Sequence, residues 1–453
     1  MKKRFLFAIA CDAITALLAL FSAFYIRLGF VPRLSELSRM EITRIALFVA
    51  VLLFSSFLLE IYSSSIETGK KEYLIRVLLS ITMSFFILTG LFYLTEFELY
   101  GRGILFITLL IFGVIQYLSH LLYLVSSSLP GFVSKILILG TGPLARQIGN
   151  LISAHNHSFT LAGYFNCTSE PVMVPYHNII DSEEGLCSAV RRVGVQKIVV
   201  SLSERRGVFP LQEVLSCKLT GVEVVDAPTF YEQMTGKLLL ENITPSWFIF
   251  SHGFRVTFML KLLKRMTDIL CASIGLTLLV PFIPVISLVI WIDSPGPILF
   301  RQTRVGEGER LFNLFKFRSM RLDAENGTGA VWAKEKDPRV TKVGEFLRKS
   351  RIDEIPQLFN VLRGDMSLVG PRPERPEFVK KLKEVIPYYS ERHYVKPGVT
   401  GWAQVRYPYG ASVEDAIEKL RYDLYYIKNI SLPFDILIIL ETVKVVLFRR
   451  GAR

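Results

Sequence analysis

Long apolar runs dominate the first quarter of the chain. Four of them are each close to the roughly 20 residues that an α-helix needs to cross a bilayer. They cover residues 5–26, 45–62, 74–94 and 104–125. The pattern therefore predicts four transmembrane helices within residues 1–130, and an even number of crossings returns the chain to its starting side.

The charges around these runs favour a cytoplasmic N-terminus only weakly. Lys and Arg in short loops mark the cytoplasmic side. Lys2, Lys3, Arg4, Lys70, Lys71 and Arg76 agree with that orientation, whereas Arg27, Arg33, Arg39 and Arg44 oppose it. Asp12 and Glu60 lie in or at the end of predicted helices, where an ionisable group can be functional. We interpret both as helix-packing or interfacial residues.

Between residues 131 and 250 the pattern changes to alternating strands and helices. Predicted strands cover residues 135–140, 161–165, 197–201 and 222–226. Strands that alternate with helices indicate a small α/β domain with a parallel sheet. The domain is expected to end near Trp247.

A glycine-rich turn follows the first of these strands. Gly140, Gly142 and Ala145 have the GxGxxA spacing with which a phosphate approaches a helix N-terminus. The acidic residue that binds a ribose about 20 residues later is missing, and Asn166 ends the second predicted strand. We interpret the domain as Rossmann-like and non-catalytic, serving contacts or regulation, with no cofactor-binding residue assigned. A working nucleotide site is the alternative.

A fifth apolar run, residues 269–292, carries no charge and opens the third region. By length it spans a membrane, but Pro281 and Pro284 near its centre remove backbone hydrogen bonds and bend a helix. A straight span would also separate the rest of the chain from the middle domain. We predict a re-entrant helix over about 261–292 in a domain of residues 251–453, with Asp268 and Asp293 on one side.

The composition rules out an ordinary soluble protein. Of the 453 residues, 51% are hydrophobic, the mean hydropathy is +0.39 and the net charge is +13. Residues 251–453 carry 33 Lys and Arg against 22 Asp and Glu, a net of +11. This basic region suits anionic headgroups or phosphate substrates, and no nucleic-acid motif accompanies it. The five cysteines have no metal-like or disulfide-like spacing, which fits a reducing, cytoplasmic setting.

The densest motif is the block from Arg348 to Glu374, which contains the adjacent carboxylates Asp353 and Glu354. Within a basic stretch, such a pair is a candidate nucleophile or magnesium ligand, because cations favour the ionised form. The alternative is a solvated acidic pair at a helix start.

With its neighbours, this block resembles the bacterial sugar transferases, or monotopic phosphoglycosyl transferases, and in particular their large WbaP-like members. Seven motifs carry the resemblance in order: Lys264-Arg265-xx-Asp268, Ser294-Pro-Gly-Pro297, Arg301-Gln-xx-Arg304-x-Gly306, Lys316-Phe-Arg318-Ser-Met320, the Asp353-Glu354 block, Gly370-Pro-Arg372-Pro373 and Lys396-Pro-Gly-Val-Thr-Gly-Trp402-Ala-Gln404. Val280-Pro281 replaces a frequent Ser-Pro break, and Arg351-Ile352 replaces a frequent Ser-Leu. Neither departure is expected to touch the carboxylate pair.

The resemblance implies a membrane enzyme with four transmembrane helices, a Rossmann-like domain, and a monotopic catalytic domain with re-entrant and interfacial helices. Asp353 would attack the β-phosphate of a UDP-sugar and release UMP, and the phosphosugar would pass to undecaprenyl phosphate. Mg²⁺ would bridge the phosphates, with Asp353 and Glu354 as candidate ligands, and Glu354 would hold the metal or act as a base. Arg348 and Arg372 suit phosphate binding. Lys316, Arg318 and Arg304 are further phosphate-binding candidates, although these three and Arg301 could instead face lipid headgroups.

The expected setting is the cytoplasmic face of a bacterial inner membrane, with membrane lipid and a second copy of the chain as possible further partners. The glycan would be an exopolysaccharide, capsule or O-antigen. Residues 432–450 form an apolar helix ending in Arg449-Arg450, either interfacial or an ordinary core helix. Two other functions stay open at this point: a membrane-bound NAD-dependent sugar-nucleotide dehydratase, and a non-catalytic regulator of polysaccharide synthesis.

Overall fold

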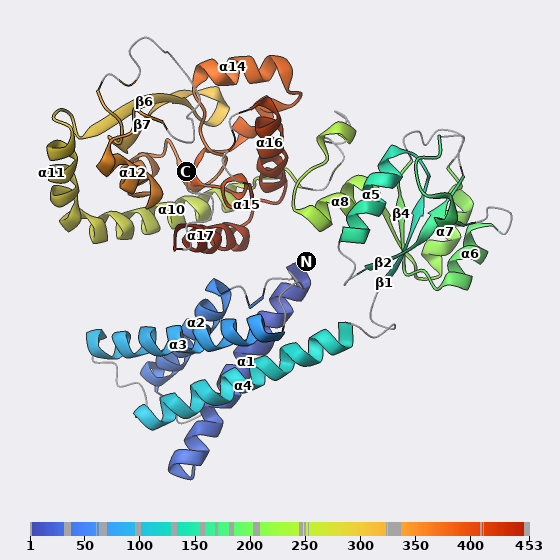
Figure 1. The fold of residues 1–453 in the computed structure, drawn as a ribbon, viewed down its shortest axis with the longest axis horizontal. Helices are drawn as coiled ribbons and strands as arrows, with labels where there is room; N and C mark the ends of the chain where they lie inside the picture. The colour runs from blue at the N-terminus through green and yellow to red at the C-terminus, as the bar shows by residue number, and fades with distance from the viewer. Residues whose placement is uncertain are drawn as a thin grey trace. The chain divides into compact units, whose positions relative to one another are not determined.

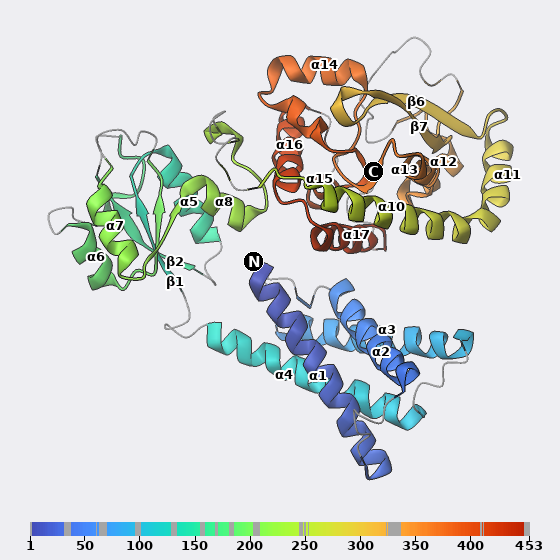
Figure 2. The same cartoon turned by 180° about the vertical axis from the view of Figure 1, so that it is seen from behind.

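The protein forms two compact units, Met1–Met234 and Thr235–Arg453, in a computed structural model (Figures 1 and 2). Each unit is described by itself. Glu60, the Pro130-Gly131 and Trp247 domain ends, and the Arg449-Arg450 pair lie outside the described residues. The structure describes residues 2–30, 38–59, 61–62, 70–95, 101–127, 134–154, 159–167, 171–180, 185–202, 209–243, 248, 251, 253–322, 324, 337–407, 410 and 412–447.

Long helices form where the apolar runs predict them. They are α1 (Lys2–Leu28), α2 (Arg39–Leu58), α3 (Lys70–Thr95) and α4 (Arg102–Ser127). A capping box starts α2, since the Ser38 side chain accepts from the Glu41 backbone N–H and the Glu41 carboxylate accepts from that of Ser38. With the apolar run at 258–293, five helices among the described residues are long and apolar enough to cross a membrane. The chain is a membrane protein.

One polar cluster lies among these helices. The buried carboxylate of Asp12 accepts hydrogen bonds from the Tyr62 hydroxyl, at 2.8 Å, and from the Gln116 side-chain amide, at 2.5 Å. Gln116 also donates to Ser56, at 3.1 Å. Asp12 therefore links α1 to the segment after α2 and to α4, which agrees with a role in helix packing.

A five-stranded parallel sheet follows, in the order β3-β2-β1-β4-β5. Helices α6 and α7 lie on one face, and α5 and α8 lie on the other (Figure 1). The parallel sheet predicted from the alternating pattern is confirmed; the very short β3 was not predicted. The elements are β1 (Ser134–Leu139), α5 (Pro143–Ala154), β2 (Phe159–Phe165), β3 (Ile179–Ile180), α6 (Leu186–Val193), β4 (Lys197–Val200), α7 (Leu211–Leu219), β5 (Glu223–Asp226) and α8 (Ala227–Thr235).

The second unit begins with a bent apolar helix pair. Helix α10 (Phe258–Leu279) and helix α11 (Ile283–Asp293) run in different directions and are joined by a 3-10 turn, Val280–Phe282 (Figure 1). Pro281 lies in that turn and Pro284 in the first turn of α11, so the bend lies where the prolines predict it. Many apolar side chains of both helices are exposed to the surroundings of the protein.

The largest core of this unit includes Trp402, Leu424, Tyr426, Phe434 and Ile438. Two smaller apolar clusters pack α10 and α11 against β7, α12 and α13. Strands β6 and β7 pair antiparallel, and the short β8 and β9 pair parallel. Trp402 donates its indole N–H to the Gly236 carbonyl at 2.8 Å, and Leu238 joins the same core. The elements are β6 (Leu299–Val305), β7 (Leu311–Phe317), α12 (Lys342–Lys349), α13 (Gln357–Arg363), β8 (Ser367–Val369), α14 (Pro376–Val385), β9 (Gly398–Thr400), α15 (Trp402–Arg406), α16 (Val413–Lys428) and α17 (Leu432–Leu447).

Candidate active site

The carboxylate pair lies on a tight turn between two short helices. Helix α12 is capped by Thr341, whose hydroxyl accepts from the Gly344 N–H at 3.0 Å. After α12, Arg351 adopts the left-handed conformation, with φ of 60°, and reverses the chain into the 3-10 turn Ile352–Glu354. A non-glycine residue in this conformation is strained and is often found at functional sites. The turn holds both Asp353 and Glu354 in buried positions.

The Glu354 carboxylate pairs with three cationic side chains. One carboxylate oxygen, Oε1, accepts from Lys316 Nζ at 3.0 Å and from Arg372 Nη2 at 2.7 Å. The other, Oε2, lies 3.5 Å from Arg351 Nη1. Burial alone raises the pKa of Glu354, but Arg372, Lys316 and Arg351 outweigh it and hold that pKa well below its usual range. Glu354 is therefore ionised and engaged through both oxygens.

The environment of the Asp353 carboxylate differs from that of the adjacent Glu354. Within the part of the chain that the structure describes, no group hydrogen-bonds its carboxylate. Burial raises the pKa of Asp353 above its usual range; Lys316, Arg348 and Arg372 oppose this effect, and the charge of Glu354 adds to it. The carboxylate is thus desolvated and makes no hydrogen bond within the described chain.

Two backbone arrangements bring the cations to the pair. Lys316 lies on β7. The Asn360 side chain of α13 accepts from the Phe315 N–H and donates to the Asn313 carbonyl, which fixes β7 against α13. Burial lowers the pKa of Lys316, an effect that the Glu354 charge opposes. Arg372 follows β8, where a side chain at Gly370 would approach the Lys396 carbonyl to 2.3 Å. Only glycine allows this close passage of two backbones.

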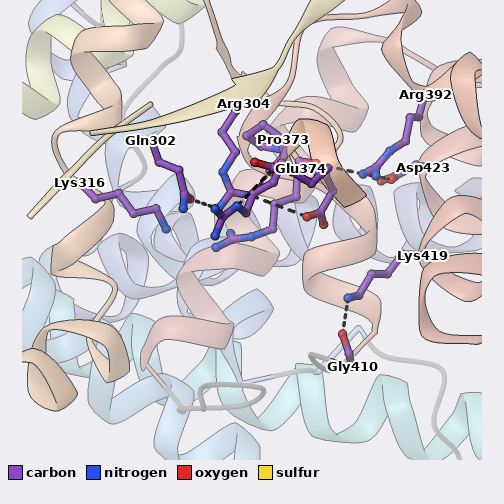
Figure 3. A network of polar contacts seen from close by, with 12 residues as sticks. Gln302, Arg304, Lys316, Pro373, Glu374, Arg392, Gly410, Lys419 and Asp423 are labelled. Atoms are coloured by element: carbon purple, nitrogen blue, oxygen red, sulfur yellow. Dashed lines mark hydrogen bonds and ion pairs between the residues drawn. The ribbon is translucent and has the colours of Figure 1, made fainter. Parts of the chain in front are cut away.

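A second network fixes the backbone at Arg372. The Arg372 carbonyl accepts from Arg392 Nη2 at 3.0 Å. The same nitrogen lies 2.8 Å from Asp423 Oδ2, a contact that Figure 3 shows. Arg392 Nη1 also donates to the Tyr389 hydroxyl at 2.6 Å. Both side chains of the Arg392–Asp423 pair are buried. Burial raises the pKa of Asp423 to about 6, although Arg392 opposes this.

The structure separates the predicted phosphate-binding residues into two groups. Lys316, Arg348 and Arg372 all act electrostatically on Asp353, and Arg348 also donates to the Ser319 hydroxyl at 2.9 Å. Arg318 is buried and donates to the Ser294 carbonyl. Arg304 donates to the Gln302 side chain at 2.5 Å and to the Pro373 carbonyl at 3.1 Å (Figure 3). The exposed Arg301 stacks over the Phe315 ring.

The Lys264-Arg265-xx-Asp268 motif anchors α10 to the folded unit. Lys264 Nζ lies 2.6 Å from Asp435 Oδ2, and Arg265 donates to the Val361 and Leu362 carbonyls at the end of α13. Asp268 Oδ1 accepts from the Leu368 N–H at 2.9 Å. These contacts are structural, and they hold the apolar helix pair beside the site.

Sequence reasoning missed three residues of the site. Arg351 was noted only as a departure from the family motif, yet it contacts Glu354 and its backbone shapes the turn. Arg392 and Asp423 were not assigned any role. For Asp423 the signal in the sequence is a charged residue within the apolar spacing of a helix, and this does not identify a partner 31 positions away.

Comparisons with known proteins identify the family of the chain. The family described as "Bacterial sugar transferase" matches residues 259–449. The UDP-N-acetylgalactosamine-undecaprenyl-phosphate N-acetylgalactosaminephosphotransferase of Aeromonas hydrophila is 42% identical over 242 residues, which is 52% of this chain and 55% of that protein. The chain therefore spans about half the length of this relative.

Two further relatives are covered over more of their length. A putative undecaprenyl-phosphate N-acetylgalactosaminyl 1-phosphate transferase of Bacillus subtilis (strain 168) is 54% identical over 130 residues, 29% of this chain and 72% of that protein. The exopolysaccharide production protein PSS of Rhizobium leguminosarum bv. phaseoli is 42% identical over 186 residues, 40% and 93% respectively. The chain belongs to the bacterial sugar transferase family.

Proposed function

We propose that this protein transfers a sugar-1-phosphate from a UDP-sugar to undecaprenyl phosphate and releases UMP. The observation that carries the proposal is the open, buried carboxylate of Asp353 beside Lys316, Arg348 and Arg372. A desolvated carboxylate with no hydrogen bond to break is suited to nucleophilic attack, and cations around it attract a diphosphate. The names of the relatives support the same substrate classes.

The reaction would proceed in two displacements at one phosphorus atom. A carboxylate oxygen of Asp353 attacks the β-phosphorus, the bond from that phosphorus to the bridging oxygen breaks, and UMP leaves with the electron pair. A phosphate oxygen of undecaprenyl phosphate then attacks the same phosphorus and returns the Asp353 carboxylate. The product is an undecaprenyl diphosphate sugar. Arg372 and Arg348 suit the phosphate oxygens, since a guanidinium can bond two oxygens at once.

Glu354 fits a positioning role better than the two roles suggested by the resemblance. Its low pKa makes it a weak base at neutral pH, because an effective base has a pKa near the working pH. Both of its oxygens already pair with Lys316, Arg372 or Arg351. We therefore expect Glu354 to orient the cations that receive the phosphates.

The site fits Mg²⁺ only as an ion shared with the substrate. No group of three or more His, Cys, Asp or Glu side chains that could hold a metal occurs among the described residues. Mg²⁺ usually binds one or two carboxylates together with substrate phosphates and water, and Asp353 offers one carboxylate with open oxygens. When bound, the ion would offset the charge of the diphosphate.

The apolar pair α10–α11 is expected to re-enter the cytoplasmic face of an inner membrane. Residues 258–293 as one straight helix would span about 54 Å and put their ends far apart. Instead, Asp268 within α10 accepts from the Leu368 N–H, and Asp293 at the end of α11 accepts from the Val343 N–H at 3.1 Å, so residues before and after the bend bond the same unit. In a cysteine-free background, Ser294→Cys should resist labelling from outside the cell, and Ser35→Cys, in the loop after the first predicted helix, should react. Efficient labelling at position 294 would indicate a true span.

The middle domain, residues 131–250, is proposed to be Rossmann-like and dispensable for chemistry. Its glycine-rich turn is buried, with Thr141 fully covered. The Met173 N–H donates to the Thr141 carbonyl at 2.8 Å, so a neighbouring loop already lies on the turn where a phosphate would bind. Both features favour a domain that makes contacts over one that binds a nucleotide.

The central test is intact-protein mass spectrometry after incubation with a UDP-sugar, beginning with UDP-N-acetylgalactosamine. The wild type should gain the mass of a phosphosugar and release UMP, and Asp353→Asn should do neither. Asp365→Asn is the matched control, because it removes the same charge from a residue paired with Arg363 instead. An adduct on Asp353→Asn, or UMP release without any adduct in the wild type, would contradict the proposed nucleophile.

A further inference from the structure

A cavity of about 170 Å³ opens beside the carboxylate pair. Its walls come from α13, β9, α15 and α17 and are mostly apolar, including Leu358, Val399 and Val446. Arg351 and Glu354 also line it. The cavity thus joins an apolar space to the site of the proposed chemistry.

The chemistry of the walls excludes the sugar nucleotide. Sugar hydroxyls and diphosphate oxygens would lose their hydration against Leu and Val side chains without gaining hydrogen bonds, which costs several kcal/mol per group. An apolar cavity of about 150 Å³ holds a six-carbon ring in another protein. A space of 170 Å³ therefore suits a five-carbon isoprene unit.

One wall is the face of a strongly apolar helix. In its 16 residues α17 has only Asp435, Glu441 and Lys444 as charged residues. Asp435 pairs with Lys264 of the apolar helix α10, so the cavity wall and the proposed membrane helix are tied together.

Two polar side chains that line the cavity have hydrogen-bonding groups without a partner in the described part of the chain. Within the described chain, Arg351 contacts one carboxylate, at 3.5 Å, and so keeps several of its five N–H donors for a phosphate. The amide oxygen of Gln404, which also lines the cavity, is buried without a hydrogen-bond donor in the described part of the chain.

We propose that this cavity binds the isoprene unit next to the phosphate of the polyprenyl acceptor, and that Arg351 holds the phosphate. This inference rests on the proposed function and assigns the acceptor its own subsite. Arg351 contacts Glu354, and Glu354 is adjacent to Asp353 in the chain. A phosphate held by Arg351 would therefore lie near an adduct on Asp353. The subsite serves the second displacement and is not needed for the first.

The test separates the two displacements. In Val446→Trp, the indole fills the cavity. Adduct formation from UDP-N-acetylgalactosamine, measured without lipid, should match the wild type, while the KM for undecaprenyl phosphate should rise at least tenfold. Ile436→Trp, on an exposed position of the same helix, is the control and should change neither value. A wild-type KM in Val446→Trp, or an equal loss of both steps, would overturn the subsite.

A second variant tests the phosphate contact. Arg351→Gly removes the guanidinium and places glycine at a φ of 60°, where glycine is less strained than arginine. Because Arg351 also contacts Glu354, adduct formation can change too, but the KM for the lipid should rise about tenfold and by more than the rate of adduct formation falls. An unchanged KM would remove Arg351 from the proposal. If the wild type itself forms no adduct, the proposed function fails, whereas an adduct with unaffected variants refutes only the subsite.

Discussion

Variants of the buried Arg392–Asp423 pair can distinguish an effect on the stability of the unit from an effect on the position of Arg372. In Arg392→Met, the Asp423 carboxylate stays buried, with an exposed fraction of 2%, and loses its cation. Removing one partner of a buried ion pair costs about 3–5 kcal/mol. In domains of this size, 1 kcal/mol shifts Tm by about 2–4 °C, which gives an expected drop of about 6–20 °C.

The pH dependence of this drop has a definite sign. Burial already raises the pKa of Asp423 to about 6, and loss of Arg392 removes the charge that opposes the rise. A carboxyl group whose folded pKa lies above its unfolded value stabilises the protein at low pH, and this stability is lost as the pH rises through the folded pKa. The Tm difference between Arg392→Met and the wild type should therefore be larger at pH 8 than at pH 5.

The double variant Arg392→Met/Asp423→Leu replaces the pair by apolar side chains and should recover most of the lost Tm. It should not recover activity, because the Arg372 carbonyl still lacks its donor, so adduct formation should stay about tenfold slower, or about 1.4 kcal/mol. Scanning fluorimetry and adduct mass spectrometry give the two values. Lys383→Met, which breaks the exposed pair with Glu309, is the control and should cost at most about 1 kcal/mol. Full activity in the double variant would refute the reasoning.

Three further outcomes are expected. In Lys316→Met, loss of a cation that lowers the pKa of Asp353 should move the acid limb of adduct formation to higher pH; an unmoved limb in a pH–rate profile would contradict this. The Cys187 and Cys217 sulfurs lie 3.0 Å apart, so oxidised glutathione should join them with the loss of two hydrogens in peptide mass spectra, and Cys187→Ser should prevent it. Gly142→Leu should lower the thermal stability while leaving UMP release measurable, since Gly142 is buried in the middle domain.

Much of the fold is predictable because the patterns that set it are local. Uncharged runs of helical length give helices, and β-rich runs between helices give parallel strands. The bend after α10 follows from Pro281, because a proline ring cannot fit a continuous helix. The two-residue strand β3 could not be predicted in this way, because two apolar residues have no measurable period.

The site is only partly predictable, because its contacts join residues far apart in the chain. The motif identifies the Asp353–Glu354 pair, but Lys316 reaches Glu354 across 38 positions and Arg372 across 18. The contact of Arg351 depends on a left-handed backbone that no pattern marks for arginine. Likewise, Cys187 and Cys217 look unrelated in the sequence and meet only because α6 and α7 share one face of the sheet.

The different environments of two adjacent carboxylates are the strongest physical reason to assign them different roles. Asp353 and Glu354 lie next to each other in one 3-10 turn. Nevertheless, cations bond both oxygens of Glu354 and hold its pKa low, while Asp353 is desolvated, has a raised pKa and stays open. Paired acids whose pKa values are pushed apart usually divide the chemistry. Here the clamped Glu354 fixes the cations, which leaves Asp353 as the group that can form a bond to phosphorus.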